Sequence, residues 1–156
     1  GGPKIEEVAQ QGDPSKFKFP ETEMPAFQYS FSGIKTAILY FLRKELKNNS
    51  HFIEENLPDI AASIQYTLIK MLLQKLRRAA REFKINQIAL AGGVSANSGL
   101  RKALEDMARK EGWRTYIPAF EYCTDNAGMI AMAAHFKYMN KEFVGQEVSA
   151  MPRMKI

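Results

Sequence analysis

With 156 residues, of which 46% are apolar, the chain can bury one ordinary core, so we expect one domain or a large part of one. The single cysteine, Cys123, excludes an internal disulfide framework, and the longest apolar runs are far too short for a membrane span. The net charge of +5 suits a nucleic-acid partner, although many proteins without such a partner are equally basic. A cytoplasmic protein without a membrane partner is the simplest assignment.

The N-terminal part is predicted to hold a short helix, an extended segment and a strand. The chain begins with Gly-Gly-Pro and no methionine, as a segment of a longer protein would, and Pro3 suits the start of a helix over residues 5–11. Three prolines indicate an extended surface segment over residues 14–25. Aromatic and polar residues alternate over residues 27–31, which predicts a short, half-buried strand.

Apolar residues at helical spacing predict two helices in the middle of the chain, over residues 34–47 and from Pro58 to about Phe83. The second helix ends in a basic run, which is made up of Lys75, Arg77, Arg78, Arg81 and Lys84. Cations at this end complement the helix dipole, which favours a solvated C-terminus. A surface that faces RNA is the alternative.

Two later stretches, residues 88–97 and 116–128, have the same build. Each is an apolar, strand-like run that breaks into a loop of small and polar residues and then opens a helix, over residues 98–110 and 125–138. In an α/β sheet, loops at the carboxyl ends of parallel strands line the ligand crevice, and helix N-termini there attract anions. We therefore predict a helix-rich α/β fold with these loops on one rim, followed by an irregular tail over residues 143–156.

The first loop supplies candidate ligand-binding residues. Gly92 and Gly93 let the backbone turn sharply and approach a ligand closely, because neither residue has a Cβ. Ser95 and Asn97 add hydrogen-bonding side chains where the helix opens. The alternative is a tight turn in which Asn97 is an ordinary helix N-cap.

The second loop offers a carboxylate, Asp125, as a candidate metal ligand, and a helix cap is again the alternative. The small residues that follow suggest a close approach of a ligand or another helix. Cys123 has no histidine near it in sequence, so we expect a buried small residue rather than a nucleophile. His51 and His135 lack the spacing of a zinc protease and are predicted to be structural or exposed.

Ser32, Lys35 and Thr36 lie where the predicted aromatic strand turns into a helix, and they could bind an anion there. A capping serine and a solvated lysine are the alternative.

Several motifs, in order along the chain, resemble the C-terminal half of the TsaD family, the tRNA adenosine threonylcarbamoyltransferases, formerly called O-sialoglycoprotein endopeptidases. The opening Gly1-Gly2-Pro3 resembles the family's Pro-Gly-Gly-Pro turn, and Pro152-Arg153 matches its usual ending. The three internal motifs are Phe31-Ser32-Gly33-Ile34-Lys35-Thr36, Ala91-Gly92-Gly93-Val94-Ser95-Ala96-Asn97 with Leu100-Arg101, and Cys123-Thr124-Asp125-Asn126-Ala127-Gly128-Met129-Ile130.

The resemblance implies an actin-like ATPase fold, in which two ribonuclease-H-like lobes hold a nucleotide between them. It places residues 1–156 in an incomplete second lobe. By position, Asn97 matches an asparagine of the family that contacts ATP or threonylcarbamoyl-AMP. Gly2 matches a glycine that contacts the same ligand, and Glu6 matches an acidic group near the ribose. Asp125 matches a metal-binding aspartate. Further contacts are implied for the loop residues Gly92, Gly93 and Ser95, and for Ser32, Lys35 and Thr124.

The resemblance also implies what the chain lacks. The family's other metal ligands belong to a His-x-x-x-His helix, and a Ser-Gly-Gly-His-Thr loop binds phosphate; neither motif is present. Asp125 alone cannot hold the one divalent metal, iron or zinc, that is expected in the full-length protein, because such sites need three or four ligands. We therefore expect part of an enzyme that is not active alone.

The full-length protein is expected to move a threonylcarbamoyl group from threonylcarbamoyl-AMP to the N6 amine of the adenosine beside a tRNA anticodon. The implied partners are tRNA, an inactive paralogue and a small ATPase, and an exposed lobe face could make the fragment an artificial homodimer. A small-molecule carbamoyltransferase and a non-catalytic binding module are the alternatives. The old protease name has no support, because the sequence has no nucleophile with its base and no zinc-protease motif.

Overall fold

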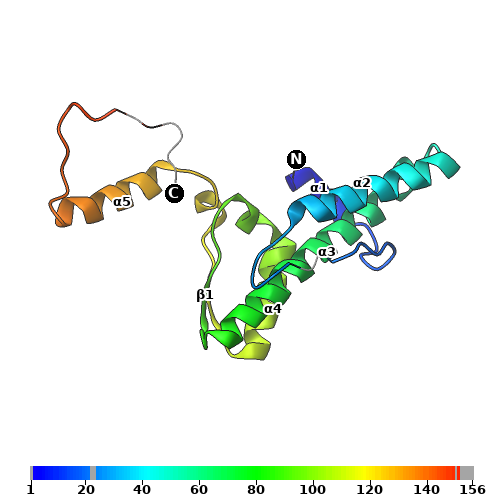
Figure 1. The fold of residues 1–156 in the computed structure, drawn as a ribbon, viewed down its shortest axis with the longest axis horizontal. Helices are drawn as coiled ribbons and strands as arrows, with labels where there is room; N and C mark the ends of the chain where they lie inside the picture. The colour runs from blue at the N-terminus through cyan, green and yellow to red at the C-terminus, as the bar shows by residue number, and fades with distance from the viewer. Residues whose placement is uncertain (1, 22–23, 150, 152–156) are drawn as a thin grey trace. The chain divides into compact units, whose positions relative to one another are not determined.

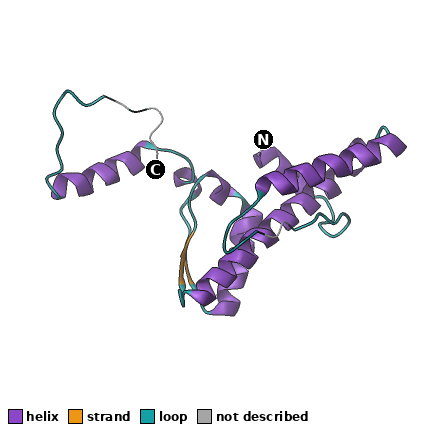
Figure 2. Cartoon of the chain, in the orientation of Figure 1, coloured by secondary structure: helices purple, strands orange, loops and turns teal. Residues whose placement is uncertain are grey.

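The computed structural model describes residues 2–21, 24–149 and 151, and helices account for most of it (Figure 2). Gly1 and the Pro152-Arg153 motif lie outside the described residues. The chain divides into two compact units, Gly1–Cys123 and Thr124–Ile156. None of the described helices is both long and apolar enough to cross a membrane.

The described residues of the first unit form four α-helices, two short strands and two 3-10 turns, and the helices can be followed in Figure 1. In chain order these are α1 (Gly2–Ala9), α2 (Phe31–Asn48), α3 (Phe52–Glu82), β1 (Gln87–Ala89), η1 (Gly93–Ala96), α4 (Ser98–Glu111), β2 (Arg114–Tyr116) and η2 (Phe120–Tyr122). The second unit contains α5 (Ala127–Met139).

The two strands are parallel neighbours, and α4 connects them. Ile88 of β1 lies opposite Thr115 of β2, with one residue pair on either side in the same register. Because parallel strands end at the same edge, the loops that follow β1 and β2 leave the sheet side by side. The prediction of a helix-rich α/β fold is confirmed at this level.

The core lies where α3 and α4 meet the sheet. Its buried side chains come from all three, and they are Leu73, Ala80, Ile88, Leu100 and Leu104. Leu104 is only 1% exposed, and Trp113 packs against the same cluster. The apolar spacing that predicted α3 therefore marks the face that this helix buries against α4 and the sheet.

A second, smaller cluster joins α1 to α3 through alanines, namely Ala9, Ala61 and Ala62. Small residues allow the backbones to approach closely. The chain just after α1 also lies close to α3 at Gly12, where a Cβ would lie 2.1 Å from the carbonyl oxygen of Pro58.

The predicted strand over residues 27–31 is wrong. Residues 27–30 form a turn and irregular chain, and α2 begins at Phe31, with the Ser30 hydroxyl capping the N–H of Gly33 at 3.3 Å. The aromatic residues before α2 pack on α3: the Phe27 ring lies 5.5 Å from that of Phe83, and the Tyr29 hydroxyl donates to Leu72 O at 3.1 Å. An alternating pattern indicates burial on one side, and here a helix supplies the covering surface.

The segment over residues 14–25, predicted to be extended and on the surface, has turns and bends over residues 14–17, and part of it packs into the protein. Phe19 is 8% exposed, and the rings of Phe17 and Phe19 each lie 5.3 Å from the ring of Phe41. Phe52 joins the same aromatic cluster.

Four helix starts differ from those predicted. Two of the differences are small: α2 starts at Phe31 instead of residue 34, and α5 at Ala127 instead of residue 125. The first helix starts at Gly2 instead of residue 5. The long helix starts at Phe52, with Glu54 and Glu55 in its first turn, so Pro58 lies inside it. Proline removes one helical hydrogen bond but fits near the start of a helix. The sequence therefore does not show whether Pro58 begins the helix or lies one or two turns inside it.

Candidate functional site

The loop after β1 turns at Gly92, whose φ of +85° and ψ of 171° are open only to glycine. The N–H of Ser95 donates to Gly92 O at 2.9 Å, which closes the 3-10 turn. The Ser95 side chain is 1% exposed, and its hydroxyl has no hydrogen-bond partner among the described residues. The glycine therefore shapes the loop as predicted, whereas the Ser95 hydroxyl points into the protein.

Asn97 ends this loop and caps α4. Its Oδ1 accepts from the N–H of Leu100 at 2.8 Å, and its Nδ2 donates to Gln65 Oε1 on α3 at 2.9 Å. The structure therefore confirms the N-cap, and it adds a side-chain bond to α3. A capping asparagine still has one Nδ2 hydrogen left for a ligand.

Glu6 of α1 meets the same helix start. Its Oε1 accepts from the N–H of Ser98 at 2.7 Å and from the Ser98 hydroxyl at 2.5 Å. A carboxylate at a helix N-terminus is favourable because of the free N–H groups and the helix dipole. Glu6 and Asn97 thus satisfy two N–H groups in the first turn of α4.

A cavity of about 460 Å³ lies between α1, α3 and the glycine loop. Gly2, Glu6, Gly93 and Asn97 line it together, whereas Gly92 and Ser95 do not. The rest of its wall is mainly apolar and includes Ile64, Leu68, Ile69, Leu72 and Leu100. An apolar cavity of this size with a few converging polar groups is the usual form of a small-molecule site.

Arg101 of α4 fastens this loop to the loop after β2. Its Nε donates to Ser95 O at 2.6 Å, and its Nη2 donates to Pro118 O at 2.8 Å and contacts Cys123 Sγ at 2.9 Å. Its guanidinium also lies 4.1 Å from the centre of the Phe120 ring. Cys123 is 3% exposed, which confirms the expected buried cysteine.

The candidate metal ligand Asp125 lies in the second unit and is exposed. The cap of α5 is Asn126, which accepts from the N–H of Met129 at 3.1 Å, so the alternative of Asp125 as a cap is wrong. Among the described residues, Asp125 forms no hydrogen bond or ion pair. Thr124 is exposed, and its carbonyl accepts from Asn126 Nδ2 at 2.9 Å. A shared rim for Asn97 and Asp125 stays a prediction.

At the start of α2, where the sequence suggests an anion site, the described hydrogen bonds of the polar side chains go to the helix itself. Ser30 caps the helix, so the idea of Ser32 as the cap is wrong. The Ser32 carbonyl accepts from the Thr36 hydroxyl at 2.9 Å, and Lys35 is exposed.

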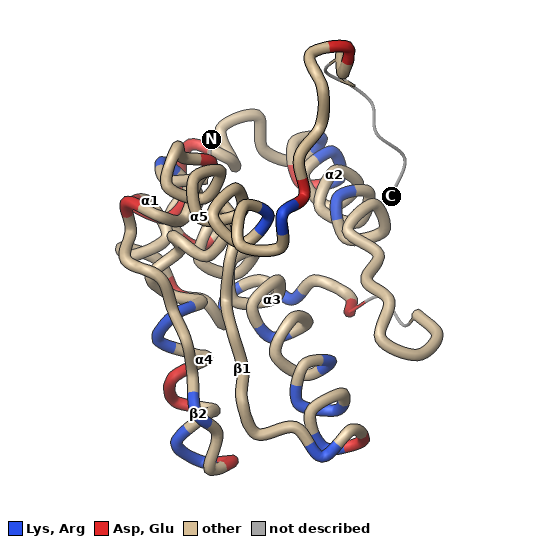
Figure 3. Tube along the Cα trace, turned by 90° about the vertical axis from the view of Figure 1, so that its left-hand side faces the viewer, with Lys and Arg blue, Asp and Glu red and all other residues tan. Residues whose placement is uncertain are grey.

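The cations of the basic run at the end of α3 are blue along the trace in Figure 3, and two of them form ion pairs. Arg77 and Arg81 both bind the carboxylate of Glu111 at the end of α4, at 2.6 and 3.0 Å. The Arg81 hydrogen bond is the main reason that the pKa of Glu111 lies below its usual value. Lys75 donates to Met24 O at 3.1 Å, and the Arg78 guanidinium lies 5.8 Å from the centre of the Phe27 ring. The run is thus neither merely solvated nor wholly free to bind RNA.

The two histidines are exposed, as predicted: His51 lies 3.1 Å from Glu54, and His135 contacts the Phe136 ring. Within the described part of the chain, no group of three or more His, Cys, Asp or Glu side chains could hold a metal ion. Asp125 fits one position in a metal's ligand shell, but these residues do not make a complete site.

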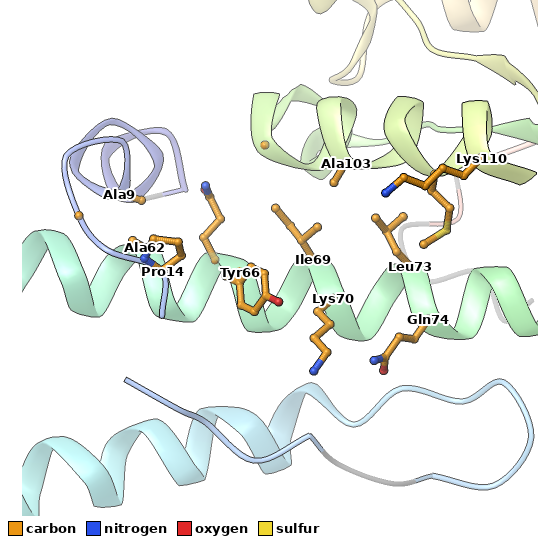
Figure 4. Close-up of a pocket in the computed structure, with 14 residues that line it drawn as sticks. Ala9, Pro14, Ala62, Tyr66, Ile69, Lys70, Leu73, Gln74, Ala103 and Lys110 are labelled. Atoms are coloured by element: carbon orange, nitrogen blue, oxygen red, sulfur yellow. The ribbon is translucent and has the colours of Figure 1, made fainter. Parts of the chain in front are cut away.

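A second cavity of about 650 Å³ lies across α3 and α4 on the side of Ala9 and Pro14 (Figure 4). In Figure 4, Ile69 and Leu73 of α3 face Ala103 of α4, whereas Lys70 and Gln74 point away from α4. Lys70 is bound to Glu21 at 2.6 Å. None of the predicted site residues lines this cavity, although Gln65 borders both cavities.

Fold and site together define an α/β protein with a glycine-rich loop and a ligand-sized cavity at the carboxyl edge of a parallel sheet. Residues 1–132 match the model of the TsaD family, described as tRNA N6-adenosine threonylcarbamoyltransferase. The chain belongs to this family.

Similar proteins carry the same name. The chain is 54% identical over 156 residues to the tRNA N6-adenosine threonylcarbamoyltransferase of Cytophaga hutchinsonii and 53% identical over 155 residues to that of Christiangramia forsetii. The enzyme of Thermotoga neapolitana is 40% identical over 158 residues. These matches cover 99–100% of this chain and 46% of each relative. The chain therefore spans about half the length of the curated relatives that it matches.

Proposed function

We propose that this chain supplies one wall of the adenylate site of a tRNA N6-adenosine threonylcarbamoyltransferase, as part of the second lobe of an actin-like fold. One observation carries the proposal: Gly2, Glu6, Gly93 and Asn97, which come from separate segments of the sequence, line a single cavity. The family match supports the reaction, and its name is that of a tRNA-modifying transferase rather than of either alternative.

In this reaction the N6 amine of a tRNA adenosine attacks the carbonyl carbon of threonylcarbamoyl-AMP. A C–N bond forms, the C–O bond to the phosphate breaks, AMP leaves with the electron pair, and the amine loses a proton. Holding both reactants in line is a large part of such catalysis. The apolar wall of the cavity suits the adenine ring, and Asn97 and Glu6 offer polar contacts at its edge.

The N-terminus of α4 is not an open phosphate site, because Glu6 and Asn97 already bind two of its N–H groups and Glu6 places a carboxylate there. We therefore assign the phosphate of threonylcarbamoyl-AMP to groups outside this chain. Asp125 would supply one ligand to the single iron or zinc ion. The other metal ligands would come from residues outside this chain. The tRNA, an inactive paralogue and a small ATPase are the proposed partners of the complete protein, and this chain alone is proposed to be inactive.

The test is transfer of threonylcarbamoyl from threonylcarbamoyl-AMP to tRNA by the complete protein, with two variants that spare the fold. Asn97→Asp keeps the capping oxygen but loses the amide donor, and Asp125→Asn changes a carboxylate that caps no helix. We expect at least a tenfold loss of transfer in each, at an unchanged melting temperature. Full activity in both variants would contradict the proposal.

A further inference from the structure

The Asn97 side chain is held at both ends by groups of fixed polarity. The N–H of Leu100 can only donate, so the atom that faces it at 2.8 Å is the carbonyl oxygen of the Asn97 amide. The other end of the amide is then Nδ2, which donates to Gln65 Oε1 at 2.9 Å. The two contacts agree on the orientation of the amide, which is normally assigned from such a network.

Gln65 packs closely against the start of α4. It is half-buried on α3, and its Nε2 lies only 3.1 Å from the position that a Cβ on Gly99 would occupy. Gly99 is in the first turn of α4, so the Gln65 amide fills the space that the missing side chain leaves. Gln65 borders the 460 Å³ cavity together with Asn97.

We propose that Gln65 is a positioning residue, which fixes the Asn97 amide so that it presents an N–H donor to the cavity. One Nδ2 hydrogen is used by Gln65, and the second is left for the ligand. The ligand atom at this place is therefore an acceptor, such as a ring nitrogen or a hydroxyl oxygen of the adenosine part. The identity of that ligand rests on the proposed function, whereas the orientation of Asn97 does not.

The first measurement is made without ligand, on the complete protein with ¹⁵N-labelled asparagine. Gln65→Met has a similar size but no acceptor, so we expect the two Nδ2 proton signals of Asn97 to shift and approach each other. Gln65→Glu keeps an acceptor, and its Asn97 signals should stay well separated. Gln74→Met is the matched control, because Gln74 lies on the same helix but does not border this cavity. Unchanged Asn97 signals in Gln65→Met would overturn the proposal, even if ligand binding fell.

The second measurement is the affinity for adenosine, a neutral probe that the charge of Gln65→Glu does not repel. We expect binding to weaken about five- to tenfold in Gln65→Met, since one well-oriented hydrogen bond is disturbed, and to be kept in Gln65→Glu and Gln74→Met. Equal affinity in Gln65→Met and the unsubstituted protein would overturn the positioning role. No adenosine binding by the unsubstituted protein would instead count against the proposed function, and the proton signals would still decide the role of Gln65.

Discussion

Gly92 is the residue whose backbone conformation most constrains the site. Its φ of +85° and ψ of 171° cost a residue with a Cβ on the order of 1–3 kcal/mol, and no atom lies within 4 Å of the position that a Cβ would take. We expect Gly92→Ala to lower the free energy of unfolding by about that amount through backbone strain alone. Chemical denaturation measures the change.

Gly93→Ala is the matched control, because Gly93 has equal space around it and no positive φ. A loss of stability in Gly93→Ala as large as that in Gly92→Ala would show that the loss does not come from the backbone conformation of Gly92.

Asp59 ties the loop after α1 to helix α3. Its carboxylate accepts from Lys16 Nζ at 2.6 Å and from the N–H of Asp13 at 2.8 Å. These two bonds hold the pKa of Asp59 below its usual value, and the bond from Lys16 has the larger effect. A lowered pKa in the folded state stabilises the protein above the unfolded pKa of about 4, and this contribution is lost as the pH falls through the folded pKa.

We therefore expect Asp59→Asn to be less stable than the unsubstituted chain at pH 7, with the difference shrinking below about pH 4. Denaturation curves between pH 7 and pH 3 measure it. Glu105→Gln is the control, since Glu105 is exposed and has no partner among the described residues. A difference that stays constant with pH would mean that ionisation of Asp59 does not contribute.

Single residues of the site differ in how far the sequence predicts them. The positions of Gly92 and Asn97 follow from local chemistry, since one must turn the chain off a strand and the other must cap a helix. The link between Asn97 and Gln65 joins residues 32 positions apart, and nothing in the pattern of α3 marks Gln65 among its other polar residues. Such a contact depends on how two helices pack, which spacing along one helix does not contain.

The two strand–loop–helix elements are coupled through Arg101. Its side chain donates to the carbonyls of Ser95 and Pro118 and contacts Cys123 Sγ, so it links the loop after β1 to the loop after β2. We expect Arg101→Met to keep the apolar stem but lose these bonds, which lowers stability by about 2–3 kcal/mol and loosens the second loop.

Cys123 reports on this loosening, because it is the chain's single cysteine and is 3% exposed. Its rate of reaction with a thiol reagent should rise at least tenfold in Arg101→Met, under conditions in which the protein stays folded. Lys102→Met is the control, since Lys102 is the exposed neighbour on the same helix. Equal rates in all three proteins would mean that Arg101 does not hold the loop.

Among the elements, the prediction succeeds where the pattern is long and fails where it is short. The helices α3 and α4 carry several turns of amphipathic sequence, and both are present, although α3 starts six residues earlier than predicted. The aromatic alternation over residues 27–31 is short enough to fit either a strand or a chain packed on a helix. No described strand is available there to pair with it, and packing on α3 covers part of the Phe27 and Tyr29 side chains instead.

At the scale of the whole molecule, the apolar character of α5 stands out. None of its residues is buried, and Ile130 and Phe136 are 73% and 61% exposed. A helix that is apolar on all sides is normally covered by protein, so the second unit carries surface suited to association. The artificial homodimer expected from the sequence stays a prediction, as does the place of Asp125 beside the cavity.

The last prediction concerns the proposed binding of tRNA by the complete protein. Arg77, Arg78 and Arg81 end α3 on an exposed face, and the Glu111 carboxylate holds two of them in place without neutralising all three charges. If this face binds phosphates, reversing the three charges to glutamate should weaken tRNA binding and reduce the slope of log affinity against log salt by about one for each phosphate that is no longer bound. Filter binding or fluorescence anisotropy measures both the affinity and the salt slope. The salt concentration is varied from about 50 to about 200 mM.

Two further variants show whether a weaker binding of tRNA comes from lost contacts at the end of α3, from the change in net charge or from damage to the fold. Reversal of Arg43, Lys44 and Lys47, three exposed cations on α2, changes the net charge equally at another place. Glu111→Gln keeps all three arginines and weakens their tether, so tRNA binding should stay the same or become stronger. Because phosphate contacts and general attraction both depend on salt, only a larger effect at α3 than at α2 supports direct binding there. Equal effects from the two triple reversals would leave net charge as the sole cause and remove the end of α3 from the tRNA surface.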